Sequence, residues 1–297
     1  MLVRDLLKSH KTTFSFEFFP PKEDAAADRL LETISNLMPL GPSYVSVTYG
    51  AGGTTRDRTH DLVVRIKEKT NITVVSHLTC VGSSRSEIDT ILDKYSEAGI
   101  NNILALRGDP PQGANDFVEP IDGFDHAADL VAYIKKHFPA MCVGVAGFPE
   151  GHPGTPNRLK EIDYLKAKVD NGADYIVSQL FFENRDFYDY CERCELAGIH
   201  VPNIAGIMPV TSKTGLIRTA ELAGGARSPA RLLRAVERAE DDDYVKRVGI
   251  HWATEQIRDL LDNGVRGIQF FTLNSSTATQ EIYTNLGVRD SNRLRTS

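Results

Sequence analysis

The feature that most constrains this fold is the regular alternation of short apolar runs with longer segments of helical periodicity. Eight such runs are rich in β-branched and aromatic residues, and most are apolar on both faces, which is typical of parallel strands buried on both sides. They cover residues 12–19, 44–49, 72–79, 102–108, 142–148, 175–182, 203–210 and 267–274. No linker or low-complexity segment interrupts them. The sequence therefore predicts a single (β/α)8 TIM barrel, as one domain over residues 1–297 with its core at about 10–288.

Helical segments lie between these runs. One apolar stripe, for example, recurs at helical spacing from Leu30 to Met38. The gap between the seventh and eighth runs is long enough for extra helices, one opened by Ser228 and Pro229 and another over about 244–263. The alternative fold is an open doubly wound sheet. That fold would more often carry a glycine-rich phosphate turn, and GVAGFPEG at 144–151 lacks the G-x-G-x-x-G spacing.

Charge and hydropathy exclude some classes of protein. The net charge of -6 argues against a general nucleic-acid binder, which would usually be basic. No apolar run approaches the length needed to span a bilayer. The first residues, MLVRDLLKSHKTT, lack the apolar region of a secretory signal. We therefore expect a cytoplasmic protein without nucleic-acid or membrane partners.

The cysteine pair in CERC, Cys191 and Cys194, is either a redox or metal motif or part of a helix core. A zinc site would need a second ligand pair, and none stands at a convincing spacing, so we expect no metal site. The two cysteines continue a helical stripe that starts at Phe187 and Tyr190. A buried helix face is therefore the favoured interpretation.

Polar residues collect where the predicted strands end. In a barrel of this kind the carboxyl ends of the strands form the active-site face. Such polar groups need a partner or a ligand if they are buried. The residues at these ends, in chain order, are Glu17, Thr48, His77, Arg107, Asp109, Glu150, His152, Gln179 and Asn274.

Glu17 is a single carboxylate inside the most aromatic segment, TTFSFEFFPPKE. Strand alternation places Phe14, Phe16 and Phe18 on one face and Glu17 on the other. If the phenylalanines pack under the helices, Glu17 points into the barrel mouth, where desolvation raises its pKa. A carboxyl group poised near neutrality suits a general acid. The alternative is a structural ion pair with a basic neighbour such as Arg107.

Other residues carry weaker signals. Arg107 could pair with a phosphate or a carboxylate, and Asp109 could accept hydrogen bonds from a heterocycle, but a local salt bridge explains the pair equally well. Gln179, a neutral amide on an inward apolar strand face, suits recognition of a ring such as a pterin. Lys168 on a helix and His152 in a loop would more often be solvated.

Several segments, taken together, resemble a known family. They are FSFEFFPPK, YVSVTYGAGGTTRDRT, HLTC, NILALRGDPP, FPEGHP, LKAKVDNGADYIVSQLFF, GIMPV and FFTLN. In this order and spacing the chain resembles the bacterial methylenetetrahydrofolate reductases, as the catalytic barrel without the regulatory domain of the animal enzymes. The resemblance implies an FAD-dependent oxidoreductase of one-carbon metabolism and methionine synthesis. It would reduce 5,10-methylenetetrahydrofolate to 5-methyltetrahydrofolate with NADH or NADPH in a ping-pong cycle.

The resemblance also implies residue roles. Glu17 matches the general acid that protonates the folate bridge nitrogen. Asp109 matches the aspartate near the flavin that also contacts the pterin, and Gln179 matches a second pterin-recognising residue. Phe271 falls at the substrate with these three. The positions that match flavin contacts are Thr48, His77, Leu106, Arg107, Gly108, Asp109, His126, Ala127, Phe148, His152, Glu161 and Lys168, of which Arg107 and Lys168 lie near the phosphates.

The chain departs from the family pattern at four positions. Phe148 stands where many relatives have Tyr, and His126 replaces an aromatic residue near the adenosine end. Thr219 and Ser275 stand where some relatives have Phe and Arg at the substrate. These differences affect affinity and cofactor preference more than reaction type.

The nearest enzyme alternative is an FAD barrel of the proline dehydrogenase type. It would bind an amino acid through arginines clustered late in the chain, but NSSTATQ follows the eighth run. A catalytically inactive binding protein is the alternative from another class. By the resemblance we expect a homo-oligomer, while the sequence leaves the choice between NADH and NADPH and the working direction open.

Overall fold

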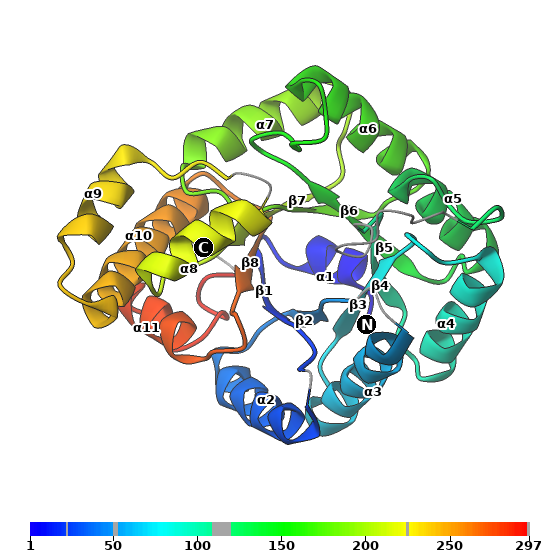
Figure 1. Cartoon of the computed structure of the whole chain (residues 1–297), viewed down its shortest axis with the longest axis horizontal. Coiled ribbons are helices and arrows are strands. Elements are labelled where there is room, and N and C mark those ends of the chain that lie inside the picture. The colour runs from blue at the N-terminus through cyan, green and yellow to red at the C-terminus, as the bar shows by residue number, and fades with distance from the viewer. Residues whose placement is uncertain (22, 50–52, 109–119, 224–225, 296–297) are drawn as a thin grey trace.

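Eight parallel strands close into a barrel in the order β1 to β8, with helices around the outside (Figure 1). This computed structural model describes all residues except 22, 50–52, 109–119, 224–225 and 296–297. The predicted (β/α)8 barrel is confirmed. The strands are β1 (Thr13–Phe18), β2 (Tyr44–Val47), β3 (Val74–Thr79), β4 (Asn102–Leu106), β5 (Cys142–Gly147), β6 (Tyr175–Ser178), β7 (Asn203–Ile207) and β8 (Gly267–Phe271).

The helices follow the strands in turn, with one before β1 and additional ones between β7 and β8. They are α1 (Val3–Ser9), α2 (Asp24–Leu37) with a short 3-10 turn at Met38–Leu40, α3 (Gly53–Thr70), α4 (Arg85–Glu97), α5 (Ala127–His137), α6 (Arg158–Asp170), α7 (Asn184–Leu196), α8 (Lys213–Leu222), α9 (Ala230–Arg238), α10 (Asp242–Asp262) and α11 (Thr277–Asn285). The predicted extra helices between the last two strands are therefore present.

The phenylalanines of β1 pack outward, as the alternation predicts. Phe14, Phe16 and Phe18 are fully buried in the layer between the strands and the helices. Phe16 meets Phe270 of β8 edge-on at 5.6 Å between ring centroids and Tyr283 of α11 at 6.3 Å. Each such aromatic pair contributes roughly 0.5–1.5 kcal/mol beyond area burial. This packing fixes the rotation of β1, so the alternate residues Ser15 and Glu17 face the barrel interior.

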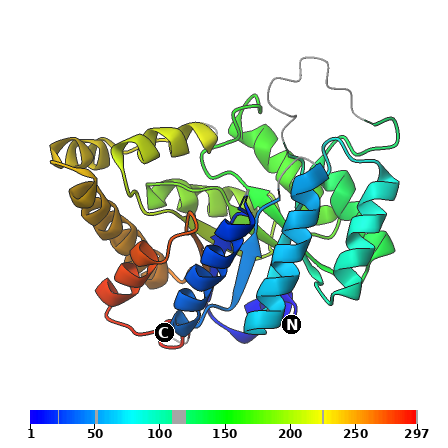
Figure 2. The ribbon, with the colours of Figure 1, turned by 60° about the horizontal axis from the view of Figure 1, so that its bottom comes forward.

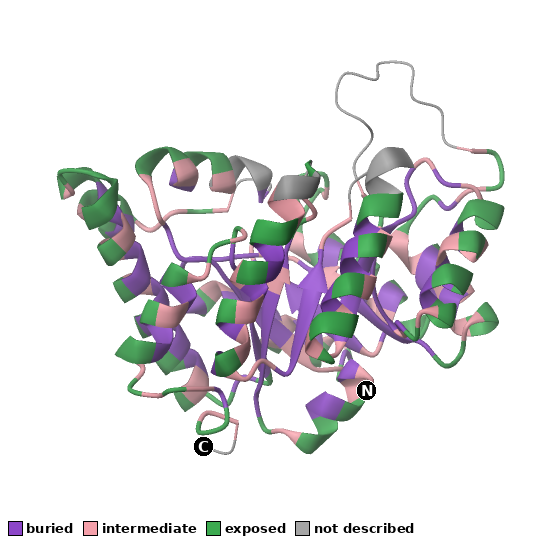
Figure 3. Ribbon diagram, turned by 90° about the horizontal axis from the view of Figure 1, so that it is seen from below, coloured by how far each residue is buried: buried purple, intermediate pink, exposed green. Residues whose placement is uncertain are grey.

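Helix α1 closes the end of the barrel opposite the carboxyl ends of the strands. Val3, Leu6 and Leu7 are buried against inward residues such as Tyr44 and Tyr175. The Asn102 side chain fixes the start of the helix, since its Oδ1 accepts from the Val3 amide at 2.8 Å. Figures 2 and 3 show α1 at the end of the molecule opposite α8 and α9. The predicted active-site face is therefore at the other mouth.

Helices α8, α9 and α10 form a second small core beside the strand ends of β6 and β7. Its residues include Leu180, Met208, Leu216, Leu232 and Val245, all buried. Figure 1 shows these helices grouped on one side of the barrel. The start of α9 differs from the sequence expectation: its N-cap is Pro229 rather than Ser228, and the helix begins at Ala230. The extra helices thus extend the wall above β6 and β7.

The strands end earlier than the apolar runs that predict them. β6 stops at Ser178, although Leu180, Phe181 and Phe182 continue the apolar run. These side chains are buried against helices after the strand has ended. Among the described helices none combines the length and apolar character required to cross a membrane.

Candidate active site

Glu17 faces the barrel interior near the carboxyl end of β1. In the strand register it lies beside Ser46 of β2 and Phe271 of β8. Its Oε2 accepts a hydrogen bond from the side-chain amide of Gln269 at 2.7 Å, and His77 Nε2 lies 3.5 Å from the same oxygen. The Glu17 side chain is 16% exposed. The carboxyl group is thus held by barrel strands, and not by Arg107.

Burial raises the pKa of Glu17 to about 8, against the hydrogen bond from Gln269 and the nearby Ser46 hydroxyl, which both favour the charged form. Burial also lowers the pKa of His77 to about 3, so its imidazole is neutral at pH 7. Glu17 and His77 are therefore a neutral acid beside a neutral base, and not an ion pair. Among the described residues, the buried His77 Nε2 lacks a hydrogen-bond partner. Such a group can contact a ligand that reaches the barrel mouth.

The turn after β8 holds the end of β1 in place. Thr272 Oγ1 donates to the Glu17 carbonyl oxygen at 2.6 Å. The Asn274 side chain accepts from the Phe19 amide at 3.0 Å and donates to the Phe19 carbonyl at 2.8 Å. Leu273 and Asn274 both have positive φ, 50° and 57°, which is uncommon for residues other than glycine. This clamp restricts the backbone that carries Glu17.

A cavity of about 270 Å³ lies at the carboxyl ends of β5 and β6. Three predicted site residues line it: Phe148, His152 and Gln179. The rings of Phe148 and His152 meet edge-on at 4.8 Å between centroids. Gln179 is held by its backbone, whose N–H donates to the Gly147 carbonyl at 2.7 Å, and its side-chain Oε1 accepts from the Leu180 N–H at 2.8 Å. The remaining lining residues are Pro149, Glu150, Gly151, Pro153, Thr155, Asn157, Arg158, Leu180, Ala223, Ala226 and Arg227.

Glu17 is not among the residues that line this cavity. The two features are nevertheless joined by successive strands of the rim, from β1 through β8 and β7 to β6. Phe271 of β8 links them, because its half-buried side chain occupies the space beside Gly206 of β7. A Cβ at position 206 would stand 2.7 Å from the Phe271 ring, so this strand position must be glycine. Glu17, Phe271 and Gln179 therefore follow one another along one arc of the mouth.

The end of β4 and the start of α5 bring together another group of predicted residues. Arg107 is exposed, and its Nε donates to the Asp125 carbonyl at 3.2 Å, directly before His126 and Ala127. His126 is the exposed N-cap of α5. Gly108 has φ +83°, and a Cβ there would collide with Val81 and Thr79. Leu106 and Ala127 are half-buried beside them.

Lys168 and Glu161 of α6 are both buried, contrary to the usual solvated helix lysine. The Lys168 ammonium donates to the Ala146 carbonyl of β5 at 2.7 Å. Burial lowers its pKa to about 8, and the nearby Glu161 opposes this shift. Glu161 Oε2 accepts from Thr155 Oγ1 at 2.7 Å. One described acceptor leaves two of the three ammonium donors of Lys168 available.

The other predicted residues are less informative. Thr48 is half-buried at the end of β2, and its N–H donates to the Phe18 carbonyl at 2.9 Å. Thr219 is half-buried on α8, and Ser275 is exposed after β8. Asp109 lies outside the described residues. The described residues hold no cluster of three His, Cys, Asp or Glu side chains that could bind a metal ion.

The comparison with protein families decides the assignment. The family model described as methylenetetrahydrofolate reductase matches residues 2–287, nearly the whole chain. This chain belongs to the methylenetetrahydrofolate reductase family.

Individual relatives agree with this assignment. The 5,10-methylenetetrahydrofolate reductase of Escherichia coli (strain K12) is 36% identical over 276 residues, which cover 93% of this chain and 90% of the relative. Methylenetetrahydrofolate reductase (NADH) 1 of Arabidopsis thaliana is 37% identical over 306 residues, 99% of this chain but 52% of the relative. The chain thus spans about half the length of the plant relatives it matches.

A solved structure supports the fold independently. It is described as an uncharacterized protein from Clostridium thermocellum that binds two copies of 5-methyl-5,6,7,8-tetrahydrofolic acid. Its TM-score is 0.65 over 96% of this chain and 99% of that chain, at 15% sequence identity. At this identity the likeness shows the barrel fold alone.

Sequence reasoning missed several residues around Glu17. Gln269, Ser15, Ser46 and Thr272 contact it or hold its surroundings. The alternation argument that turns Glu17 inward also turns Gln269 inward between Ile268 and Phe270, so that signal was available. By contrast, nothing in the sequence indicates that Arg227 lines the cavity, because it lies 77 residues from its partner Glu150.

Proposed function

We propose that this member of the methylenetetrahydrofolate reductase family reduces 5,10-methylenetetrahydrofolate to 5-methyltetrahydrofolate, with FAD as cofactor and NADH or NADPH as hydride donor. The single barrel would carry the whole catalytic site. When bound, FAD would supply the hydride chemistry that links the nicotinamide and folate half-reactions. The residues of the chain would bind and orient these molecules and supply the proton.

The observation that carries the proposal is the carboxyl group of Glu17, which lies largely buried at the barrel mouth between Gln269 and His77. Its pKa of about 8 leaves the acid mostly neutral at pH 7, where an ordinary glutamate is ionised. Opening the folate bridge requires a proton on the bridge nitrogen before hydride can be accepted. Glu17, whose Oε2 accepts from Gln269 at 2.7 Å, would be the general acid for that step.

The residues present fit a flavin dinucleotide. The buried Lys168 ammonium, with donors left over, and the exposed Arg107 supply the positive charge that two phosphates require. The N-terminus of α5 adds the backbone N–H of Ala127 and the positive end of the helix dipole, while the His126 N–H is already bonded to Asp129 Oδ2 at 3.0 Å. The unpartnered His77 Nε2 is one further contact for a polar ring. The proposed set is completed by Thr48, Leu106, Gly108, Asp109, Phe148, His152 and Glu161.

For the folate, Gln179 and Phe271 would form the recognition wall. No described residue accepts from the side-chain N–H groups of Gln179, so they can donate to a pterin while its Oε1 accepts from the Leu180 amide. Phe271 offers an apolar edge between Gln179 and Glu17. Asp109, by the family likeness, would contact both pterin and flavin. Because Thr219 and Ser275 replace larger side chains of some relatives, the outer part of the substrate should be held more by the cavity walls.

An absorbance spectrum tests the proposal directly. The purified protein should be yellow, and the visible flavin bands should bleach on anaerobic addition of NADH or NADPH. Subsequent addition of 5,10-methylenetetrahydrofolate should restore the bands and yield 5-methyltetrahydrofolate. The proposal fails if the folded protein contains no flavin and takes none up, or if the reduced protein is not reoxidised by the folate. Parallel titrations with the two nucleotides would decide the donor.

A further inference from the structure

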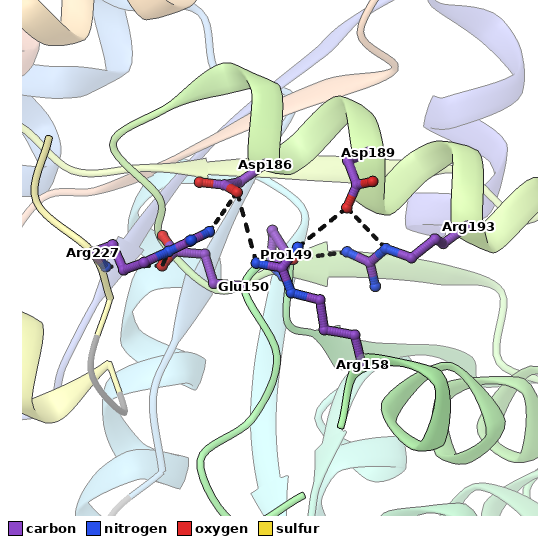
Figure 4. Close-up of polar contacts among 7 residues, drawn as sticks. All are labelled: Pro149, Glu150, Arg158, Asp186, Asp189, Arg193 and Arg227. Atoms are coloured by element: carbon purple, nitrogen blue, oxygen red, sulfur yellow. Dashed lines mark hydrogen bonds and ion pairs between the residues drawn. The ribbon is translucent and has the colours of Figure 1, made fainter. Parts of the chain in front are cut away.

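Three arginines and three carboxylates form a ring of alternating charge beside the cavity (Figure 4). The ring starts at Glu150 in the loop after β5 and returns to the carbonyl of its neighbour, Pro149. It joins the β5–α6 loop, α6, α7 and the segment between α8 and α9. Its contacts are Glu150 Oε2 to Arg227 Nε at 3.0 Å, Arg227 Nη2 to Asp186 Oδ1 at 2.5 Å, Asp186 Oδ1 to Arg158 Nη2 at 3.9 Å, Arg158 Nη1 to Asp189 Oδ2 at 3.4 Å, Asp189 Oδ2 to Arg193 Nε at 3.0 Å, and Arg193 Nη2 to the Pro149 carbonyl at 2.9 Å.

Arg227 is the member of the ring that comes from the segment between α8 and α9. It binds through its backbone as well as its side chain, since its N–H also donates to Glu150 Oε2, at 2.8 Å. Ala223, Ala226 and Arg227 all line the cavity that contains Gln179 and Phe148. The contacts of Arg227 therefore fix part of a cavity wall that is distant in sequence from the rest.

Burial makes the Arg227–Glu150 contact more than a surface ion pair. The Glu150 side chain is 11% exposed, whereas Arg227 is 60% exposed. Glu150 Oε1 is buried and lacks a hydrogen-bond partner among the described residues. The negative charge of the carboxylate is therefore stabilised through Oε2, which is bonded to Arg227. Exposed ion pairs contribute little, but removing the cation from a buried carboxylate is strongly unfavourable.

The arginines themselves could suggest an anion site in the cavity. The charge count argues against it, because each of the three arginines is matched by one of the three carboxylates around the ring. An incoming anion would have to displace Glu150 or Asp186 from Arg227. The ring is therefore arranged to hold protein segments together and not to bind a charged ligand.

We propose that Arg227 is a positioning residue for the substrate pocket: bound to Glu150 and Asp186, it fixes the wall formed after α8 relative to Gln179 and Phe148. This inference rests on the proposed function, since it takes the cavity as the place where the folate lies next to the proposed flavin contacts Phe148 and His152. Arg227 acts through Glu150 and Asp186 and does not touch the reacting atoms. Its contribution is to substrate binding, and the proton transfer by Glu17 proceeds without it.

Steady-state kinetics of Arg227→Ala test this role. We expect KM for 5,10-methylenetetrahydrofolate to rise by about tenfold, with kcat changed by less than about threefold and flavin content unchanged. Arg227→Lys should recover part of the loss, because an ammonium can reach one carboxylate but cannot bind two as the guanidinium does. The matched control is Arg234→Ala on the exposed face of α9, which should behave as the wild type. An unchanged KM in Arg227→Ala, or a loss of flavin in parallel with activity, would overturn the proposal.

Substitution of Asp186 distinguishes a positioning role of Arg227 from its direct contact with the substrate. It binds Arg227 but is not among the residues that line the cavity. If Arg227 acts through the ring, Asp186→Asn should also raise KM, and the double variant should show less than the sum of the two effects. If Asp186→Asn leaves KM unchanged while Arg227→Ala raises it, Arg227 contacts the substrate directly and the proposal is wrong.

Hydrogen exchange gives a measurement that does not depend on the reaction. In the ligand-free wild type, the Arg227 amide should be protected by its bond to Glu150. Glu150→Gln or Asp186→Asn should speed exchange in peptides that cover residues 226–233, and Arg234→Ala should not. If exchange is faster in the variants but the protein reduces no folate, the positioning role of Arg227 is upheld and the proposed function is refuted. If exchange is unchanged in the variants and the wild-type protein reduces folate, only the positioning role of Arg227 is refuted.

Discussion

The side-chain amide of Gln269 donates to Glu17 Oε2 at 2.7 Å, across 252 residues of sequence. Ser15 Oγ donates at 3.3 Å to the amide oxygen of the same glutamine, so the nitrogen of that amide is turned toward Glu17. Oε2 is then the accepting oxygen, and the proton of the neutral acid is favoured on Oε1. A glutamine cannot itself take up the proton, so its effect on Glu17 is orientation and pKa.

Glu17→Gln should separate the two half-reactions. The amide keeps the shape of the side chain but has no acidic proton, so reduction of the folate should slow by about 10³-fold or more. Flavin reduction by NADH needs no acid at this position and should stay within a few-fold of the wild-type rate. Stopped-flow absorbance of each half-reaction measures this. An equal loss in both would mean that Glu17 has a structural role.

The pH dependence of folate reduction should report the Glu17 pKa. The proton-bearing form is present below the pKa of about 8, so the rate of this half-reaction should fall as pH rises through that value. Gln269 favours the ionised form, so Gln269→Met should move the fall to higher pH by on the order of one unit, besides lowering the rate by loss of orientation. Ser15→Ala is the milder comparison. A fall that moves to lower pH in Gln269→Met would contradict the assignment.

The free energy of unfolding should also depend on the ionisation of Glu17. The pKa of Glu17 is raised in the folded state, so between about pH 4.5 and 8 the unfolded chain has lost the proton and the native protein retains it. Stability conferred by the neutral acid is therefore complete below pH 4.5 and is lost as pH rises to 8. Glu17→Gln, which cannot ionise, should gain stability relative to wild type over this range, by on the order of a few kcal/mol. Urea unfolding at pH 5 and pH 8.5 tests this.

The barrel could be predicted because its parallel strands are buried on both faces, so each strand appears in the sequence as a nearly continuous apolar run. These runs overestimate strand lengths where apolar residues continue beyond the ladder, as at Phe181 and Phe182, which pack against helices. Helix α1 was missed by the sequence analysis. Its few apolar residues are buried only because they pack against the inward side chains at the open end of the barrel. That requirement is tertiary, and no local pattern encodes it.

Some features of the candidate site also followed from the sequence, and others did not. The direction of Glu17 followed from alternation and from Phe14, Phe16 and Phe18, and the structure confirms it. The burial of Lys168 did not follow, because a lysine on a helix gives the same pattern whether its stem is covered or not. The predicted closed barrel pairs β1 with β8, but the contact of Gln269 with Glu17 depends on the register between these strands, which the sequence does not define.

Lys168→Met should lose flavin. The methionine fills the apolar part of the site but removes the buried ammonium, so the flavin-to-protein ratio released on denaturation should fall by at least about tenfold under dilute conditions. In wild type, flavin affinity should also weaken above about pH 8, where the ammonium loses its proton. Lys160→Met on the same helix, a half-exposed lysine paired with Asp163, is the control and should retain flavin. Full flavin content in Lys168→Met would remove the lysine from the proposed cofactor site.

Asp174, between α6 and β6, should be a stability residue with no part in the chemistry. It accepts from the Val143 amide of β5 at 2.7 Å and pairs with Lys135 at 2.5 Å and Arg4 at 3.5 Å, so one largely buried carboxylate ties α5, β5 and the segment around α1 together. Asp174→Ala leaves the Val143 N–H without its acceptor and removes the carboxylate from Lys135, which keeps only the Met141 carbonyl at 3.3 Å, so the loss should be about 2–4 kcal/mol. The exposed Asp163→Ala should cost less than about 0.5 kcal/mol, because surface pairs contribute little. Urea midpoints of both variants, with flavin bound at saturation, measure the difference. Equal midpoints for the two would show that Asp174 contributes no more to stability than an exposed carboxylate.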